Sequence, residues 1–171
     1  MEPSFRECAF RAPDAQDMRA LGGALGSCLA DGDAVALIGG LGAGKTCFAQ
    51  GVAAGMGIVE DVVSPTFNIL LTYQGQRGTL HHFDLYRLED ASQLEDTGYF
   101  ECTDEGTPGA CLIEWADLFP DEVPESALSV HIAAESAGEG SVRIVHVHAG
   151  DARAESLLNR WINAVGQGGR S

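Results

Sequence analysis

The stretch Ile38-Gly39-Gly40-Leu41-Gly42-Ala43-Gly44-Lys45-Thr46 decides the fold of this chain. It matches the phosphate-binding loop pattern Gly-x-x-x-x-Gly-Lys-[Ser/Thr] at every fixed position. An apolar run over residues 34–38 precedes it and is typical of a short buried strand, and apolar residues at helical spacing follow it at positions 48, 52 and 56. A strand, this loop and a helix in that order predict an α/β fold of the P-loop NTPase type.

The residue types in this loop are suited to holding a phosphate chain. Glycines let the backbone adopt positive φ and approach a ligand closely, so that amide groups point toward phosphate oxygens. The N-terminus of the following helix adds partial positive charge. Lys45 is expected to reach the β- and γ-phosphates, and the Thr46 hydroxyl to coordinate Mg²⁺. We therefore expect nucleotide contacts from Gly39, Leu41, Gly42, Ala43, Gly44, Lys45, Thr46 and Cys47.

Lys45 is the only lysine in the chain. A compact ammonium group stands where a cation must touch phosphate, and every other strongly basic residue is an arginine. The guanine-recognition motif Asn-Lys-x-Asp cannot occur elsewhere, because it needs a second lysine, and no Asp-x-x-Gly switch motif is present. ATP is therefore the expected nucleotide.

The 171 residues suit one domain with a substantial core. We expect a single P-loop ATPase domain over residues 1–166 and a disordered tail over 167–171. No apolar run approaches the roughly 18 residues that span a bilayer, and the first residues lack a signal sequence. We therefore expect a cytoplasmic protein without membrane contact. The five cysteines form no Cys-x-x-Cys pair, which gives little support for a zinc or redox site.

The chain is strongly acidic, with 25 Asp and Glu residues against ten Lys and Arg residues and a formal net charge of −15. Nucleic-acid binders usually present a basic patch. Tight, direct binding of tRNA or DNA by the isolated chain is therefore not expected. An acidic protein can instead dock onto a more basic protein partner.

Hydrophobic periodicity and turn residues predict the remaining elements. We expect a mixed central sheet in three layers, with parallel core strands and antiparallel hairpins. The expected elements are an edge strand over 4–10, helices over 14–30, 88–98 and 151–165, a hairpin over 68–73 and 79–84, a buried strand over 110–115, and a second hairpin over 126–134 and 141–148.

Two acidic residues are expected near the phosphates. Glu114 ends a strongly apolar run, which is the pattern of a strand that places a carboxylate near Mg²⁺. Asp84 ends a hairpin arm and could orient or deprotonate a water molecule, or hold the metal through water. The segment Ser64-Pro65-Thr66-Phe67 is expected to be extended, because a proline disfavours the helical region for the residue before it, and either lies near the site or forms a strand-entry turn.

Five motifs in order resemble the bacterial TsaE (YjeE) ATPase family. They are Gly-Gly-Leu-Gly-Ala-Gly-Lys-Thr at 39–46, Ser-Pro-Thr-Phe at 64–67, His-Phe-Asp-Leu-Tyr-Arg-Leu at 82–88, Leu-Glu-x-x-Gly at 94–98 and Ile-Glu-Trp at 113–115. The resemblance covers roughly residues 15 to 118. Gly40 stands where the family often has an acidic or amide residue, and Cys47 where it usually has threonine.

The resemblance implies a function in making threonylcarbamoyladenosine in tRNA. Family members bind a TsaD–TsaB complex, and their ATP hydrolysis supports its repeated turnover, so contact with tRNA would be indirect. Carried over by position, Lys45 holds the phosphates, Thr46 and Glu114 hold Mg²⁺, and Asp84 positions the attacking water or the metal shell. The resemblance also implies that Thr66 senses the γ-phosphate and that Trp115 packs near the nucleotide.

Two other functions remain open on the residues alone. A small-molecule kinase needs cations over the transferred phosphate, and between the loop and Glu114 only Arg77 and Arg87 are present. A nucleotide-dependent binding switch would use the same loop without meaningful turnover.

Overall fold

A computed structural model of the chain describes residues 6–40, 42–63, 68–104, 106–137 and 140–168. Two of the expected site residues, Leu41 and Thr66, lie outside these ranges.

The described chain folds around one seven-stranded mixed sheet in the order β1-β7-β6-β2-β5-β4-β3. β2 runs parallel to both β5 and β6, and β4 runs parallel to β5, whereas the pairs β1–β7, β6–β7 and β3–β4 are antiparallel. This arrangement confirms the expected fold class. The strands are β1 (Arg6–Ala12), β2 (Ala34–Ile38), β3 (Leu70–Gly75), β4 (Gly78–Asp84), β5 (Ala110–Glu114), β6 (Leu128–Ala137) and β7 (Gly140–Ala149).

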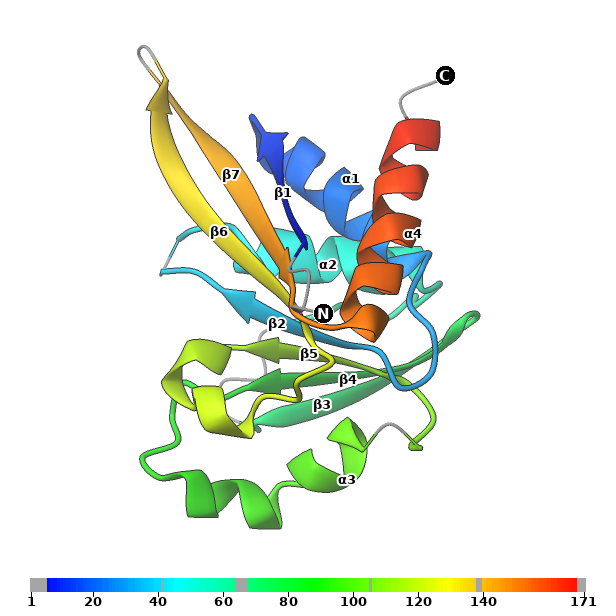
Figure 1. The fold of residues 1–171 in the computed structure, drawn as a ribbon, viewed down its shortest axis with the longest axis vertical. Helices are drawn as coiled ribbons and strands as arrows, with labels where there is room; N and C mark the ends of the chain where they lie inside the picture. The colour runs from blue at the N-terminus through cyan, green and yellow to red at the C-terminus, as the bar shows by residue number, and fades with distance from the viewer. Residues whose placement is uncertain (1–5, 41, 64–67, 105, 138–139, 169–171) are drawn as a thin grey trace, which may run out of the picture.

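Helices cover both faces of the sheet and divide its core in two. Figure 1 shows α1, α2 and α4 grouped together, with α3 at the opposite end of the molecule beside β3. The larger buried cluster lies under α1, α2 and α4, and the smaller one lies on the other face, under α3 and the 3₁₀ turns. The helices are α1 (Ala15–Gly26), α2 (Lys45–Gly55), α3 (Tyr99–Thr103) and α4 (Ala152–Gly168), and the 3₁₀ turns are η1 (Ala91–Asp96), η2 (Ala116–Leu118) and η3 (Pro120–Glu122).

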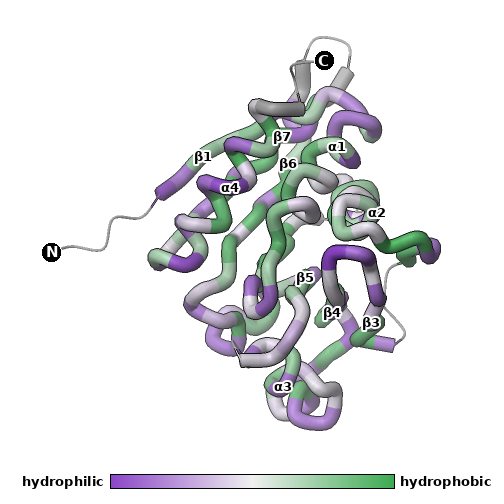
Figure 2. Tube along the Cα trace, turned by 90° about the vertical axis from the view of Figure 1, so that its right-hand side faces the viewer, coloured by the Kyte–Doolittle hydropathy of each residue, from purple (hydrophilic) through white to green (hydrophobic). Residues whose placement is uncertain are grey.

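Trp161 of α4 anchors the larger cluster. Its ring is fully buried and lies 4.8 Å from the ring of Phe10 and 5.9 Å from that of Phe48, between centroids. Its indole N–H donates to the carbonyl oxygen of Leu21 at 3.0 Å, so that the one polar atom of the ring is satisfied. Figure 2 shows the alternation of hydrophilic and hydrophobic residues along α4 that produces this buried face.

The helix that carries the phosphate loop is held by a close backbone crossing with α1. A Cβ atom at Gly26 would lie 2.0 Å from the carbonyl oxygen of Val52, and one at Gly51 would lie 2.2 Å from that of Arg19. Only glycine permits such an approach, because any side chain would force the two backbones apart. The crossing fixes where α2 begins relative to the sheet, and hence where the loop lies.

Three helical expectations differ from the structure. The segment expected as a helix over 88–98 is the 3₁₀ turn η1, because Asp90 caps its start and Gly98, at φ 87°, ends the run and begins the short helix α3. The helix α1 stops at Gly26, four residues short of the expected end, and the carboxylate of Asp33 holds the following turn by accepting from the Ala30 amide. Helix α4 continues to Gly168, into the segment expected to be a disordered tail.

Both hairpins are tighter than expected. β3 and β4 pair up to Gly75 opposite Gly78, so the turn holds only Gln76 and Arg77 where five loop residues were expected. β6 and β7 likewise pair from Ser129 opposite His148 up to Ala137 opposite Gly140, so only positions 138 and 139 lie between the two strands. Gly78, the first residue of β4 after the β3–β4 turn, has a φ of 138°, a conformation that glycine adopts readily.

Candidate functional site

The strand register brings the two expected carboxylates together. Asp84 at the end of β4 lies opposite Glu114 at the end of β5, and Glu114 in turn lies opposite Leu37 of β2. The phosphate-loop sequence begins directly after β2. The carboxyl ends of parallel strands are where α/β sheets place their ligands. The loop and both acids therefore share one edge of the sheet.

A hollow of about 420 Å³ opens at this edge. It brings together most of the side chains and loop residues that the sequence predicts for the site. Gly39 is buried at the start of the loop but does not line the hollow, and Leu41 and Thr66 lie outside the described residues. The lining consists of Gly42, Ala43, Gly44, Lys45, Thr46, Cys47, Asp84, Tyr86, Glu114 and Trp115.

The loop has the backbone conformation that its glycines predict. Gly42 has a φ of 76° and Gly44 a φ of 112°, both in the left-handed region that side chains disfavour. Gly44 also forms the N-cap of α2 and offers no side chain to the first amides of the helix. The first amides of α2 can therefore donate to a bound anion, which the helix dipole also favours. Helix N-termini bind phosphate in this way.

The Lys45 ammonium group is buried without a hydrogen-bond acceptor in the described part of the chain. The ring of Trp115 lies close to it, with its centroid 3.4 Å from Nζ. Burial lowers the pKa of Lys45, and the nearby carboxylates of Glu114, Asp84 and Asp117 oppose this shift. A buried cation without an acceptor is costly, so this group is suited to an anionic ligand.

Trp115 adopts a strained backbone conformation that aims its ring at Lys45. Its φ is 58° and its ψ is 33°, a left-handed conformation that is uncommon for a bulky residue. The ring also packs on Tyr86 with centroids 4.8 Å apart. Strain of this kind costs on the order of 1 kcal/mol and persists where the surroundings impose it, often at functional sites.

The two carboxylates are both buried but have different partners. Asp84 is 2% exposed, and one of its oxygens accepts from the backbone amide of Tyr86 at 3.0 Å. Glu114 is 3% exposed, and its Oε2 lies 2.6 Å from Nε2 of His82. The neighbouring His81 is also buried, and its ring nitrogens lie 3.3 Å from Thr72 Oγ1 and 3.1 Å from the carbonyl oxygen of Pro108.

The donor set at this edge suits Mg²⁺ better than a metal held by protein alone. No group of three or more His, Cys, Asp or Glu side chains is placed to hold a metal within the ranges that the structure describes. Mg²⁺ is usually bound by one or two carboxylates together with substrate phosphates and water. The Thr46 hydroxyl, Glu114 and Asp84 line the same hollow and could supply the protein part of such a shell.

Arg143 of β7 holds the phosphate loop from its other side. Its Nε donates to the carbonyl oxygen of Ala43 at 3.0 Å, and its Nη2 donates to that of Gly42 at 3.2 Å. These bonds satisfy two carbonyl groups of the loop. Arg143 also lines a second hollow of about 270 Å³, which shares Gly42, Gly44 and Cys47 with the first.

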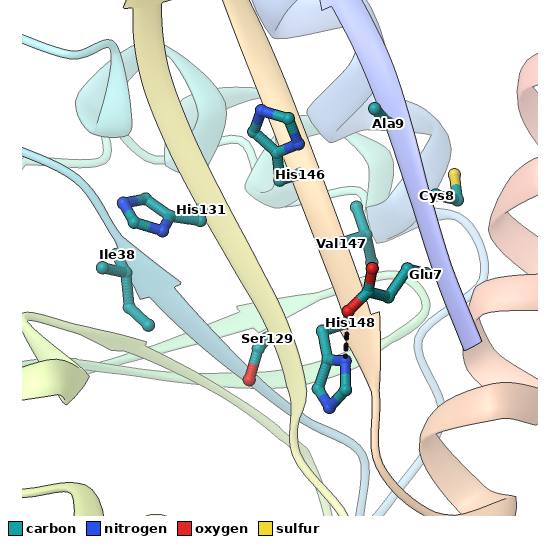
Figure 3. Close-up of a pocket in the computed structure, with 9 residues that line it drawn as sticks. All are labelled: Glu7, Cys8, Ala9, Ile38, Ser129, His131, His146, Val147 and His148. Carbon is teal, nitrogen blue, oxygen red and sulfur yellow. Dashed lines mark ion pairs between the residues drawn. The ribbon is translucent and has the colours of Figure 1, made fainter. Parts of the chain in front are cut away.

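A third hollow, of about 460 Å³, lies on the face of β1, β7 and β6 that α1 and α4 do not cover. Figure 3 shows its three histidines, His131 on β6 and His146 and His148 on β7. The imidazole Nδ1 of His148 forms an ion pair with Glu7 at 3.5 Å. Ile38, at the end of β2, lines this hollow, but none of the described residues among positions 39–46 does.

Sequence reasoning missed three residues of the site: His82, Tyr86 and Arg143. His82 had an available signal, because strand alternation places it on the same face as Asp84. Tyr86 lies just past the strand end and gave no separate signal. Arg143 could not be found from a local pattern, since it lies 100 positions from the carbonyl group that it holds.

The helices of the described chain include none that is long and apolar enough to cross a membrane.

Comparison with known proteins identifies relatives of this chain. The family model for "Threonylcarbamoyl adenosine biosynthesis protein TsaE" matches residues 12–143. The tRNA threonylcarbamoyladenosine biosynthesis protein TsaE of Treponema pallidum (strain Nichols) is 41% identical over 137 residues, which cover 80% of this chain and 98% of that protein. The protein of the same name from Bacillus subtilis (strain 168) is 37% identical over 131 residues, 75% of this chain and 78% of that protein.

A solved structure extends the likeness to nearly the whole chain. The crystal structure of Bacillus subtilis YdiB matches with a TM-score of 0.76 at 27% identity, covering 94% of this chain and 97% of that one. With the family model matching most of the chain and the fold shared as well, the chain belongs to the TsaE family of threonylcarbamoyladenosine biosynthesis proteins.

Proposed function

We propose that this chain is the ATP-binding and ATP-hydrolysing subunit of tRNA threonylcarbamoyladenosine biosynthesis, working with a TsaD–TsaB complex. The observation that carries the proposal is the buried ammonium group of Lys45, which has no hydrogen-bond acceptor among the described residues and lies beside two buried carboxylates at the start of α2. A phosphate chain supplies the missing negative charge, and Mg²⁺ between phosphate and carboxylates keeps the acids from repelling it.

Each residue at the hollow has a task in this proposal. Lys45 and the loop amides bind the β- and γ-phosphates, and Thr46 and Glu114 hold Mg²⁺. When bound, the metal neutralises charge that develops on the phosphates. Asp84 orients the attacking water, since its carboxylate is fixed by the Tyr86 amide beside the metal acid. Trp115, whose ring centroid lies 3.4 Å from the Lys45 ammonium, packs near the bound nucleotide in this proposal.

The nucleoside end of ATP is proposed to occupy the hollow of about 270 Å³ on the other side of the loop. The two hollows share three lining residues, Gly42, Gly44 and Cys47. One bound nucleotide can therefore extend along the loop and occupy both hollows at once. Pro13, Ala15 and Met18 give this second hollow an apolar wall suited to a base.

The partner in this proposal is a protein complex, with tRNA reached only through it. The net charge of −15 disfavours direct contact with tRNA phosphates and favours docking onto a basic protein surface. Family membership supports the pathway, and the TsaD–TsaB complex is the partner that the family resemblance implies.

The experiment is ATP hydrolysis by the purified chain with and without the TsaD–TsaB complex. We expect slow hydrolysis alone and faster hydrolysis with the complex, with both lost in Lys45→Ala. Hydrolysis by Lys45→Ala at the normal rate would refute the assignment of the site. Hydrolysis that the complex leaves unchanged would refute the partner.

A further inference from the structure

His82 and Glu114 form a buried pair behind the phosphate hollow. The two residues come from adjacent parallel strands, with His82 opposite Leu112 and Glu114 opposite Asp84 in the register. The side chain of His82 is 1% exposed and that of Glu114 is 4% exposed. The distance from Nε2 to Oε2 is 2.6 Å, slightly shorter than the range of about 2.7–2.9 Å for a charge-assisted hydrogen bond between nitrogen and oxygen. Such a bond between buried groups fixes both side chains.

The imidazole of His82 makes this one polar contact in the described part of the chain. Its Nδ1 is buried and has no hydrogen-bond partner there. A carboxylate oxygen can only accept, so the neutral ring carries its proton on Nε2 and donates it to Glu114. Among the described residues, the ring therefore hydrogen-bonds to Glu114 alone.

His82 does not line the hollow, whereas Glu114 does. The imidazole therefore has no direct access to a phosphate or a metal at the site. It contacts Glu114, which does line the hollow. In metal sites, a carboxylate ligand is commonly oriented by a second residue that hydrogen-bonds to it, and loss of that residue weakens metal binding.

We propose that His82 is a positioning residue that holds Oε2 of Glu114 and thereby keeps Oε1 turned toward Mg²⁺; this rests on the proposed function. With Oε2 occupied by the imidazole N–H, one oxygen remains for the cation and the carboxylate cannot rotate to offer both. The bond also compensates a carboxylate that is buried before the nucleotide arrives. Asp84, which accepts from the Tyr86 amide, is oriented by backbone instead.

The test is a Mg²⁺ titration of the binding of a non-hydrolysable ATP analogue. His82→Leu removes the donor and keeps an apolar side chain in the space, whereas His82→Gln keeps an N–H donor. We expect His82→Leu to raise the Mg²⁺ midpoint about tenfold, the lower end of what outer-shell changes cost in metal affinity. Binding of the analogue without Mg²⁺ should stay unchanged, and His82→Gln should recover most of the loss.

His81→Leu is the matched control. His81 is also buried, but its ring nitrogens lie near Thr72 Oγ1 and the carbonyl oxygen of Pro108, away from the carboxylates. It should lower the melting temperature without moving the Mg²⁺ midpoint. A wild-type midpoint in His82→Leu, or a loss in His82→Gln as large as in His82→Leu, would overturn the proposal.

A measurement on the unmodified chain covers the case in which His82→Leu does not fold. Nitrogen-15 NMR of the histidine rings should show the Nε2–H tautomer for His82. The Nδ1–H tautomer would overturn the proposal, since Nε2 could not then donate to Glu114. Failure of the wild-type chain to bind the analogue at any Mg²⁺ concentration would instead overturn the proposed function, and this inference with it.

Discussion

The hollow at the phosphate loop and the hollow on the open face of β1, β7 and β6 have similar volumes, about 420 and 460 Å³, but different linings. The first gathers a buried lysine and two buried carboxylates at the start of a helix. The hollow on the open face gathers mostly exposed or half-exposed side chains, among them His131 and His146, and Val147 is its buried exception. Volume therefore does not identify the site. The buried ammonium group of Lys45, which has no hydrogen-bond acceptor among the described residues, does, because burying a cation in this way is costly unless a ligand compensates it.

The largest effect should come from removing the buried cation of the first hollow. Lys45→Ala is expected to weaken binding of ATP by about 100- to 1000-fold, the cost typical of losing one preorganised charged donor. Lys45→Arg should recover little, because a planar guanidinium does not replace a compact ammonium in a tight loop. Isothermal titration with ATP and Mg²⁺ measures both. Wild-type affinity in Lys45→Ala would remove the distinction between the two hollows.

Within the first hollow, the two carboxylates should separate by function. Glu114→Ala is expected to weaken Mg²⁺-dependent binding of ATP by about 10- to 100-fold, as loss of a metal ligand would. Asp84→Asn should leave binding near normal and lower kcat by about 100-fold, within the range for loss of a group that positions or deprotonates water. Steady-state kinetics with Mg²⁺ titrations compare them. A pure affinity loss in Asp84→Asn, or unchanged Mg²⁺ dependence in Glu114→Ala, would reverse the assignment.

A smaller effect should come from Arg143, which we call the clamp because it holds the carbonyl groups of Ala43 and Gly42 in the phosphate loop. Arg143→Met removes the bonds to the carbonyl oxygens of Ala43 and Gly42, and we expect about tenfold weaker binding of ATP, since a hydrogen bond to a charged group contributes roughly 1.5 kcal/mol. Arg153→Met is the control, because Arg153 pairs with Asp33 at 3.3 Å, away from the loop. Equal losses in both variants would point to general destabilisation and against a clamp.

Local patterns predicted much of the first hollow. The strand, the loop and the helix follow from one contiguous stretch, and Asp84 and Glu114 were each found because a carboxylate ends a strand. Their juxtaposition needed only the expectation that parallel strands end at one edge. The part of the site that lies within contiguous stretches of sequence could therefore be predicted.

The contacts that support the site could not be predicted from the sequence, because they depend on the strand register and on segments that are distant in the sequence. The bond between His82 and Glu114 exists only because β4 and β5 pair in one register. The clamp by Arg143 depends on a hairpin at the far end of the chain. The segment 88–98 was predicted as one helix ending at Gly98, whereas the cap at Asp90 starts only the short 3₁₀ turn η1.

The smallest effect is expected from the histidines of the third hollow, on the open face of β1, β7 and β6. A double variant, His131→Gln with His146→Gln, should change ATP affinity by less than about twofold, since both side chains are exposed and surface changes usually stay within 0.5 kcal/mol. The same titration with ATP and Mg²⁺ measures it, and the melting temperature checks the fold. β6 pairs with β2, and β2 leads directly into the phosphate loop, so the sheet offers a route between the two hollows. A tenfold change in affinity with normal stability would show that this route carries a signal, and the two hollows would then have to be treated as one coupled site.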